Sequence, residues 1–524
     1  MTLIDEIPPE RSSVKRPALA PFFAIVWFAF LTGCTTLQRE GVSEERVISV
    51  AVKIDPSVEH QKISGFGATS LAGIMVTGNG VRDLLSTGLR AQALKAVYEE
   101  VGLNLGSIQL WQEPRNDNED PSVINRDGFR WEVSDAIYEV LVRPARPYGF
   151  VDFSLGLTID MRHELVWMKE LRENDYSQYL DEVAEYVVAG VSHWWEISGT
   201  VPRLITLFNE PLSGNRELQG GSIQEVVDII NYAGKRLHEE GFSQTKFIVP
   251  AEETVEKSID TSRAILADKT ARSYIGALAY HAYPYDSAYS SVQRILQTSA
   301  KGLPEKGEIA IRKQLYELAA QYDIPLWMTE TSEGPGRADY SFGSPENLRA
   351  RANHIVDELV YANASAYFAM YNLWDRQSHE DHFRDRGIAF FSESSHIALV
   401  DQETSNVYVS GIGFAIGHFA RWIAPDSWRI DAVSDNRLVK VVAFRSAIQN
   451  KLTVVVINNS NSRANMDLYL ENMAANGIVK GEFSDRENRW QELGPLKLSD
   501  TKSLKLVINP LSVTSLSATL IDRD

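Results

Sequence analysis

Regular alternation between strand-like and helical segments constrains the fold of this chain more than any other feature. Eight short apolar segments, typical of buried strands, are separated by longer stretches that suit helices. The helical patterns are clearest at 176–198 and 222–241, and the second ends at Gly241. The eight strand-like segments are 62–68, 103–111, 149–157, 203–209, 246–250, 276–283, 324–330 and 365–374. This alternation indicates the α/β class.

Eight strand–helix units match the span of a (β/α)8 TIM barrel, although doubly wound sheets alternate in the same way. Polar or aromatic residues stand at the C-terminal ends of four of the predicted strands, and barrel enzymes assemble their sites on that face. These residues are Asn209, Glu210, His281, Tyr283, Glu330, Trp374 and Asp375. We therefore predict a TIM barrel over residues 61–419.

The sequence changes character after Arg421. Short, alternating, β-branched segments follow, bounded by Asn, Asp, Ser and Pro, and they predict an antiparallel β-sandwich over residues 420–524. Residues 46–60, before the barrel, have the same character. We expect them to supply a strand to that sandwich, which makes the smaller domain discontinuous in sequence.

The N-terminal segment has the layout of a secretory signal. Basic residues precede a short apolar run from Ala18 to Leu31, and "LTGC" closes the run at Cys34. "LTGC" resembles the lipobox of bacterial lipoproteins, in which the cysteine is lipidated. We expect a signal peptide over residues 1–33, a polar tether over 34–45, and a lipid anchor in the bacterial cell envelope, periplasmic or at the surface. An uncleaved membrane anchor with an incidental cysteine is the alternative.

Composition excludes some classes of function. The 524 residues include 44% hydrophobic and 23% charged residues, which are ordinary globular values. The formal net charge of -18 opposes non-specific binding of nucleic acid, because such binding needs a basic face. We therefore expect no nucleic-acid partner.

Two carboxylates carry the predicted chemistry. "LITLFNEP" places Glu210 at the end of the fourth strand, and "IPLWMTE" places Glu330 at the end of the seventh. Strand ends on a barrel mouth direct their side chains toward a common centre. Glycoside hydrolysis needs two carboxyl groups, one to protonate the leaving oxygen and one to attack the sugar or activate water.

Several short motifs, in order along the chain, resemble glycoside hydrolases of clan A. They are "NEP" (209–211), "HAYPY" (281–285), "WMTE" (327–330) and Trp374. Within that clan the sequence is most similar to family 30, retaining β-glycosidases with a barrel and a side β-sandwich. Three further stretches carry that resemblance: "QKISGFGATS" (61–70), "IGHFARWIAPDSWRI" (416–430) and "INPLSVTSLSATL" (508–520).

The resemblance implies a role for each matching residue. Glu210 is expected to be the acid/base and Glu330 the nucleophile. Asn209 is expected to bind the substrate 2-hydroxyl, Tyr283 to orient Glu330, and Trp374 to stack against the sugar. Retention requires the two carboxyl groups to lie about 5–5.5 Å apart.

Other candidates have weaker support. His281 shares a strand face with Tyr283, so we expect it to bind substrate or to be a hydrogen-bonded core histidine. Trp111, at a strand end, is expected to line the cleft. Glu333 is the competing nucleophile. Glu252 and the adjacent Glu253 line the site or face water.

The sequence also departs from the family pattern. After the second strand, Gln109 and Trp111 stand where an arginine is expected, with Arg115 just beyond.

His163 and Glu164 begin like a zinc-binding helix, but Trp167 replaces the second histidine, so no metal site is predicted. No cofactor is implied.

The sequence favours a lipid-anchored, retaining β-glycoside hydrolase that acts on a β-linked oligo- or polysaccharide. Two alternatives stay open. One is an endo-glycanase (glucanase, xylanase or agarase) of another clan A family, and the other is a surface lipoprotein that binds glycans without hydrolysing them.

Overall fold

The chain divides into two compact units, residues 1–44 and 45–524, and every described residue belongs to the second. The predicted signal peptide, Cys34 and the tether therefore lie outside the described residues. Among the residues that are described, none of the helices has the length and apolar character needed to cross a membrane. The computed structural model describes residues 47–69, 76–77, 80–81, 87–110, 123–125, 128–129, 131–149, 152–159, 161, 167–213, 217–218, 220–282, 306–331, 345–375 and 396–521.

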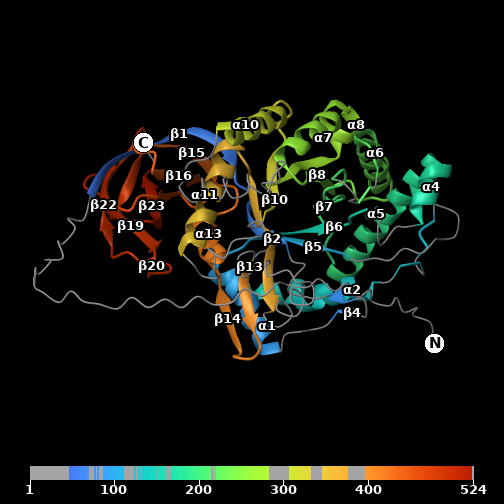
Figure 1. The fold of residues 1–524 in the computed structure, drawn as a ribbon, viewed down its shortest axis with the longest axis horizontal. Coiled ribbons are helices and arrows are strands. Elements are labelled where there is room, and N and C mark those ends of the chain that lie inside the picture. Colours follow the sequence, from blue (N-terminus) through green and yellow to red (C-terminus); the bar gives the residue numbers. More distant parts are fainter. Residues whose placement is uncertain are drawn as a thin grey trace, which may run out of the picture. The chain divides into compact units, whose positions relative to one another are not determined.

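Eight parallel strands close into a barrel, as predicted (Figure 1). Around the barrel the order is β10-β11-β2-β5-β6-β7-β8-β9, so β10 and β9 close the ring. Each barrel strand overlaps one predicted strand. The strands are β2 (Gly65–Thr69), β5 (Leu105–Gln109), β6 (Asp152–Gly156), β7 (Leu204–Thr206), β8 (Lys246–Glu252), β9 (Ile275–His281), β10 (Leu326–Glu330) and β11 (Ala366–Ala369).

Helical segments connect the barrel strands. The two clearest predicted helices are present as α5 and α6, with ends within two residues of those expected. The α-helices are α1 (Thr87–Lys95), α2 (Glu132–Ile137), α3 (Arg143–Ala145), α4 (Met168–Asn174), α5 (Tyr176–Ser198), α6 (Ile223–Glu239), α7 (Val255–Ala267), α8 (Lys269–Ser273), α10 (Lys306–Ala320), α11 (Pro345–Tyr361) and α13 (Gly411–Ala420). The other helical turns are η1 (Ala96–Glu100), η3 (Tyr138–Val142) and η4 (Arg146–Tyr148).

Side-chain caps set where the helices around the candidate site begin. Asp175, Ser222 and Thr254 each accept a hydrogen bond from a backbone N–H of the first turn, at the starts of α5, α6 and α7. After α6, Gly241 adopts a φ of 91°, which suits glycine and ends the helix. These caps fix where the loops between strands and helices begin.

The eighth predicted strand, 365–374, is divided in two. β11 stays in the barrel, and the backbone N–H of Met370 donates to the carbonyl of Thr331, beyond the end of β10. The chain then leaves the barrel as β12 (Tyr371–Asp375), which pairs with β13 (His396–Asp401), and β13 pairs with β14 (Asn406–Val409). Trp374 therefore lies on this small sheet and not at the end of a barrel strand. A further pair, β3 (Val76–Thr77) and β4 (Gly80–Val81), forms a two-stranded ribbon.

The second domain is a β-sheet of ten strands with a separate hydrophobic core. The main path has the order β20-β19-β23-β17-β16-β15-β1-β18-β22, and β21 pairs with β19. The architecture is that of a TIM barrel with a β-sandwich side domain. The strands are β1 (Val47–Lys62), β15 (Trp428–Ser434), β16 (Val439–Ser446), β17 (Lys451–Asn458), β18 (Arg463–Leu470), β19 (Ala474–Ser484), β20 (Gln491–Glu492), β21 (Leu496–Lys497), β22 (Ser503–Ile508) and β23 (Ser512–Ile521).

The N-terminal strand β1 lies inside this C-terminal sheet, between β15 and β18 (Figure 1, blue among red). It pairs antiparallel with β15 but parallel with β18. We predicted an antiparallel sheet, and the pair of β1 with β18 departs from that prediction. A parallel pair needs a long connection, and the whole barrel stands between these two strands in the sequence.

Polar contacts join barrel helices to the sheet. The imidazole of His418, on α13, lies 2.8 Å from each of the hydroxyls of Ser484 and Ser515. Lys440, on β16, pairs with Asp357 of α11 at 2.6 Å. All of these residues except the half-buried Lys440 are buried, so the two domains share an interface with satisfied polar groups.

Candidate active site

Glu210 follows β7 at the C-terminal end of the barrel. Pro211 has no backbone N–H and cannot continue a strand. The chain turns here, with Glu210 at a φ of 58°, and its N–H donates to the carbonyl of Ala251 at 2.9 Å. Glu210 is buried. A residue other than glycine at positive φ is uncommon and persists where neighbouring contacts hold it.

His281 and Glu330 are the last residues of two neighbouring strands, β9 and β10. They are paired in register across the sheet, and the N–H of Ala282 donates to the carbonyl of Glu330 at 3.0 Å. The side chain of His281 is buried, whereas 18% of the Glu330 side chain is exposed. The neighbouring strand ends therefore place both groups at the barrel mouth.

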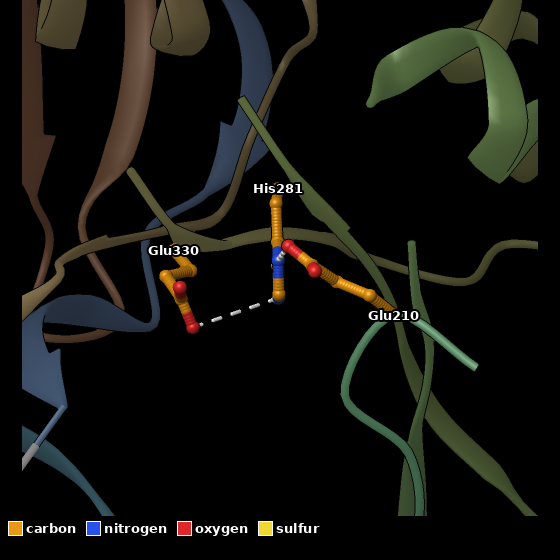
Figure 2. Close-up of side chains that lie close together, drawn as sticks. All are labelled: Glu210, His281 and Glu330. Atoms are coloured by element: carbon orange, nitrogen blue, oxygen red, sulfur yellow. Dashed lines mark hydrogen bonds and ion pairs between the residues drawn. The ribbon is translucent and has the colours of Figure 1, made fainter. Parts of the chain in front are cut away.

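The imidazole of His281 lies between the two carboxyl groups (Figure 2). Its Nδ1 is 3.1 Å from Oε1 of Glu210, and its Nε2 is 4.0 Å from Oε2 of Glu330. One oxygen of each glutamate and one ring nitrogen all lie within 4.8 Å of one another. Three titratable groups from β9, β10 and the turn after β7 thus converge on one point.

Opposing effects set the charge of His281. Burial by itself lowers the pKa of the imidazole, but the nearby carboxylates of Glu330, Glu210 and Glu252 outweigh burial and raise the pKa above its usual range. An imidazolium between carboxylates donates from both ring nitrogens. The carboxylates therefore favour the charged, imidazolium form of His281.

Glu252, at the end of β8, is a further acid in this group. It is fully buried, and it accepts hydrogen bonds from the Thr261 hydroxyl at 3.2 Å and from the N–H of Leu212. Burial raises the pKa of Glu252 to about 7. Glu253 instead pairs with Lys257 at 2.6 Å. The sequence left both roles open, and the structure places Glu252 beneath the turn that carries Glu210.

Asn209 is held through its backbone. Its N–H donates to Oε2 of the buried Glu217 at 2.6 Å. Glu217 could not be predicted from the sequence, because an acid in a loop eight residues away carries no strand or helix pattern. Tyr371 is a second missed residue. Burial, followed by the charge of Glu330, raises the pKa of its phenol.

Several predicted site residues cannot be placed in this arrangement. Trp111, Tyr283 and the competing nucleophile Glu333 lie outside the described residues, and so does Cys34. For Trp374, on β12, the structure describes the backbone but not the side chain. Their predicted roles stay predictions.

The three converging groups have a spacing that a metal ion also accepts. Their chemistry suits proton transfer equally well, because a buried and a partly exposed carboxyl flank one imidazole. The short distance between the two carboxyls allows both to act on a single bond placed between them.

Comparison of the sequence with known proteins gives a partial match. No protein-family model matches the chain. Glucuronoxylanase XynC of Bacillus subtilis (strain 168) is 26% identical over 164 residues, which are 31% of this chain and 32% of that protein. The match thus spans about a third of the length of this curated relative.

Solved structures match over most of the chain. The catalytic domain of GH30 xylanase C from Talaromyces cellulolyticus has a TM-score of 0.64 at 16% identity, over 90% of this chain and 100% of that one. A GH30 endoxylanase from Clostridium papyrosolvens C71 has a TM-score of 0.60 at 17% identity, with the same coverage. At such identities the likeness establishes the fold.

Proposed function

We propose that this protein is a retaining β-glycoside hydrolase of the family 30 type, with Glu330 as nucleophile and Glu210 as acid/base. One observation carries the proposal: an oxygen of Glu210 and an oxygen of Glu330 lie within 4.8 Å at the barrel mouth. Retaining enzymes hold their carboxyl groups about 5–5.5 Å apart, whereas inverting enzymes leave about 6.5–9.5 Å for a water molecule. The short distance favours direct attack.

The reaction follows from this geometry in two steps. Glu330, the more exposed carboxylate, attacks the anomeric carbon while Glu210 protonates the departing oxygen, which breaks the glycosidic bond. A covalent glycosyl-enzyme forms. Glu210, now a carboxylate, then removes a proton from water, and the hydroxyl displaces Glu330 with the original configuration restored.

His281 assists in both steps. A protonated imidazole beside Glu330 and Glu210 stabilises whichever carboxylate is ionised at that stage. It also orients Glu210, because the contact at 3.1 Å limits rotation of that carboxyl.

The proposed substrate is a β-linked polysaccharide, with xylan first. This choice is supported by the glucuronoxylanase and the xylanases whose sequence or fold this chain resembles. Glucans come second, since other structures with this fold include an endo-β1,6-glucanase.

A hydrolysis screen tests the proposal. Protein lacking residues 1–34 is incubated with aryl β-glycosides, xylans and β-glucans, beside Glu210→Gln and Glu330→Gln. Glu239→Gln, on the exposed face of α6, is the matched control. We expect one substrate class to be cleaved. The rate of hydrolysis should fall at least about a thousandfold in Glu330→Gln and should not change in the control.

The configuration of the first product, followed by NMR, tests retention separately. A product of inverted configuration rules out the covalent step. Glycan binding without any hydrolysis in the wild type favours the non-catalytic alternative instead.

We also propose that the chain is lipid-anchored at Cys34 in the bacterial cell envelope. The basic residues, the apolar run and "LTGC" support this. Expressed in a bacterium at full length, the wild type is expected in the membrane fraction, and Cys34→Ala in the soluble envelope fraction. Equal membrane retention of Cys34→Ala would favour an uncleaved anchor.

A further inference from the structure

A cleft of about 520 Å³ lies between helices α10 and α11 of the barrel and strands β1, β15 and β16 of the sheet. Asn363, which lines it, stands three residues before the start of β11. This is the N-terminal end of the barrel, whereas Glu210 and Glu330 follow the C-terminal ends of their strands. The cleft is therefore separate from the candidate active site.

Arg429 is the unusual residue of this cleft. It is only 7% exposed, and its guanidinium donates to two neutral amides: to Oε1 of Gln61 at 2.7 Å and to Oδ1 of Asn363 at 3.1 Å. Gln61 is fixed in turn, since its NH₂ group donates to the carbonyls of Leu359 and Ala364. The amide oxygen of Gln61 is thus held toward Arg429.

Within the described residues Arg429 makes no ion pair, and the charge of Asp431, which raises the pKa of Arg429, does not outweigh burial. By contrast, Arg312 contacts Glu358 at 2.6 Å, and Lys440 contacts Asp357 at 2.6 Å. Burial lowers the pKa of Arg429 to about 10, so the group stays charged at neutral pH. A buried charge that no carboxylate contacts directly is costly.

The guanidinium still has donors to offer. Of its five N–H groups, the two bonds to Gln61 and Asn363 use two. A carboxylate is the group that best matches such donors, because it accepts two parallel hydrogen bonds. Arg429 therefore points to an anionic group in the cleft.

The remaining lining decides which anion fits. Lys313 and Tyr316 of α10 line one wall, and 37% of Tyr316 is exposed. The carboxylates of Glu317 and Asp431 also line the cleft, and Asp431 lies 3.4 Å from His60. Two acids repel a compact dianion such as phosphate, but they accept hydrogen bonds from hydroxyl groups.

We propose that this cleft is a second glycan-binding site, for a sugar residue that carries one carboxylate. The carboxylate binds Arg429, the ring packs on Tyr316, and the hydroxyls donate to Glu317 and Asp431. The volume lies within the 300–1,000 Å³ of ordinary ligand sites. This proposal does not depend on the hydrolase activity, because the two sites share no residue.

Titration calorimetry of protein lacking residues 1–34 tests the site, with glucuronic acid, glucose and inorganic phosphate as probes. The Glu330→Gln variant is titrated in parallel to separate this cleft from the candidate active site. We expect glucuronic acid to bind at least about tenfold more tightly than glucose, in line with one charge-assisted contact. Phosphate is expected to bind more weakly than glucuronic acid.

Two variants locate the binding. Tyr316→Ala changes an exposed ring and is expected to weaken glucuronic acid binding about tenfold, while Arg429→Gln abolishes it. Arg263→Gln, on the exposed face of α7, is the matched control and should bind as the wild type does. If Arg429→Gln fails to fold, Tyr316→Ala decides.

Three outcomes overturn the proposal. Undiminished binding in Tyr316→Ala places the sugar elsewhere, and equal affinity for glucose removes the role of the carboxylate. Tighter binding of phosphate would make the cleft an anion site without sugar recognition.

Discussion

The Nδ1 atom of His281 lies 3.1 Å from Oε1 of Glu210, and both side chains are buried at the barrel mouth. The same imidazole faces Glu330 through its other nitrogen at 4.0 Å. In the proposed double displacement the ionisation of these two glutamates alternates, and one ring contacts both of them. Its removal should therefore affect turnover more than substrate binding.

We expect His281→Ala to lower kcat about a hundredfold with little change in KM. His281→Asn, whose amide can still donate near the position of Nδ1, should retain more activity. Carboxylates raise the pKa of His281, so activity that needs the imidazolium falls as pH rises through that raised pKa. The fall in kcat at alkaline pH should therefore be absent from the pH profile of His281→Asn. An unchanged profile in both variants would leave His281 a structural residue.

Chemical rescue distinguishes the two glutamates. Azide is a small anion that fits the space left by a truncated carboxylate. In Glu330→Ala, azide should attack the anomeric carbon directly and give a glycosyl azide of inverted configuration. In Glu210→Ala, azide should attack the glycosyl-enzyme and give the retained product. We expect a recovery of about tenfold or more with an activated aryl glycoside.

NMR of the glycosyl azides reads the assignment directly. A retained azide from Glu330→Ala would move the nucleophile to another residue, with Glu333 as the first candidate. Glu239→Gln, with added azide, should behave as the wild type does.

The barrel could be predicted from the sequence because its strands carry local signals. Apolar segments end in polar residues, and this pattern predicts that Glu210 and Glu330 stand at strand ends. It could not separate β11 from β12, since residues 365–374 contain no glycine or proline to mark the break. At the break, the N–H of Met370 donates to the carbonyl of Thr331, a long-range contact that no local pattern predicts.

Partners that hold the site in place were harder to predict. Glu217 and Glu252 act through backbone N–H groups of Asn209 and Leu212, and such contacts depend on how loops fold back. Likewise, the parallel pairing of β1 with β18 joins segments about 400 residues apart, for which no local pattern exists.

Glu252 should make the stability of the protein depend on pH. Burial raises its pKa from 4.5 to about 7, so the folded state binds more protons than the unfolded state between these values. The free energy of unfolding therefore falls as pH rises through this window, by about 3 kcal/mol. The penalty is absent below pH 4.5 and complete above pH 7.

Glu252→Gln removes this titration and keeps an oxygen that can accept from Thr261 and Leu212. We expect the difference in free energy of unfolding, variant minus wild type, to be larger at pH 8 than at pH 5. Urea denaturation at the two pH values measures this difference. Glu253→Gln, whose carboxylate pairs with Lys257 at the surface, is the matched control and should show no such gain. A parallel pH dependence in all three proteins would assign the slope to other groups.

The last prediction concerns β1, which joins the start of the described chain to its C-terminal sheet. Ile54 is fully buried in the core of that sheet, whereas Val58, on the same strand, is 43% exposed. Ile54→Ala leaves a cavity and should lower the free energy of unfolding by about 2–5 kcal/mol, while Val58→Ala should change it by less than about 1 kcal/mol. Because Lys440 and Arg429 link this sheet to the barrel helices and their loops, we expect barrel and sheet to unfold together in one calorimetric transition. Equal effects of the two substitutions would mean that β1 does not lie in the core of the sheet, and two transitions would mean that the barrel folds without it.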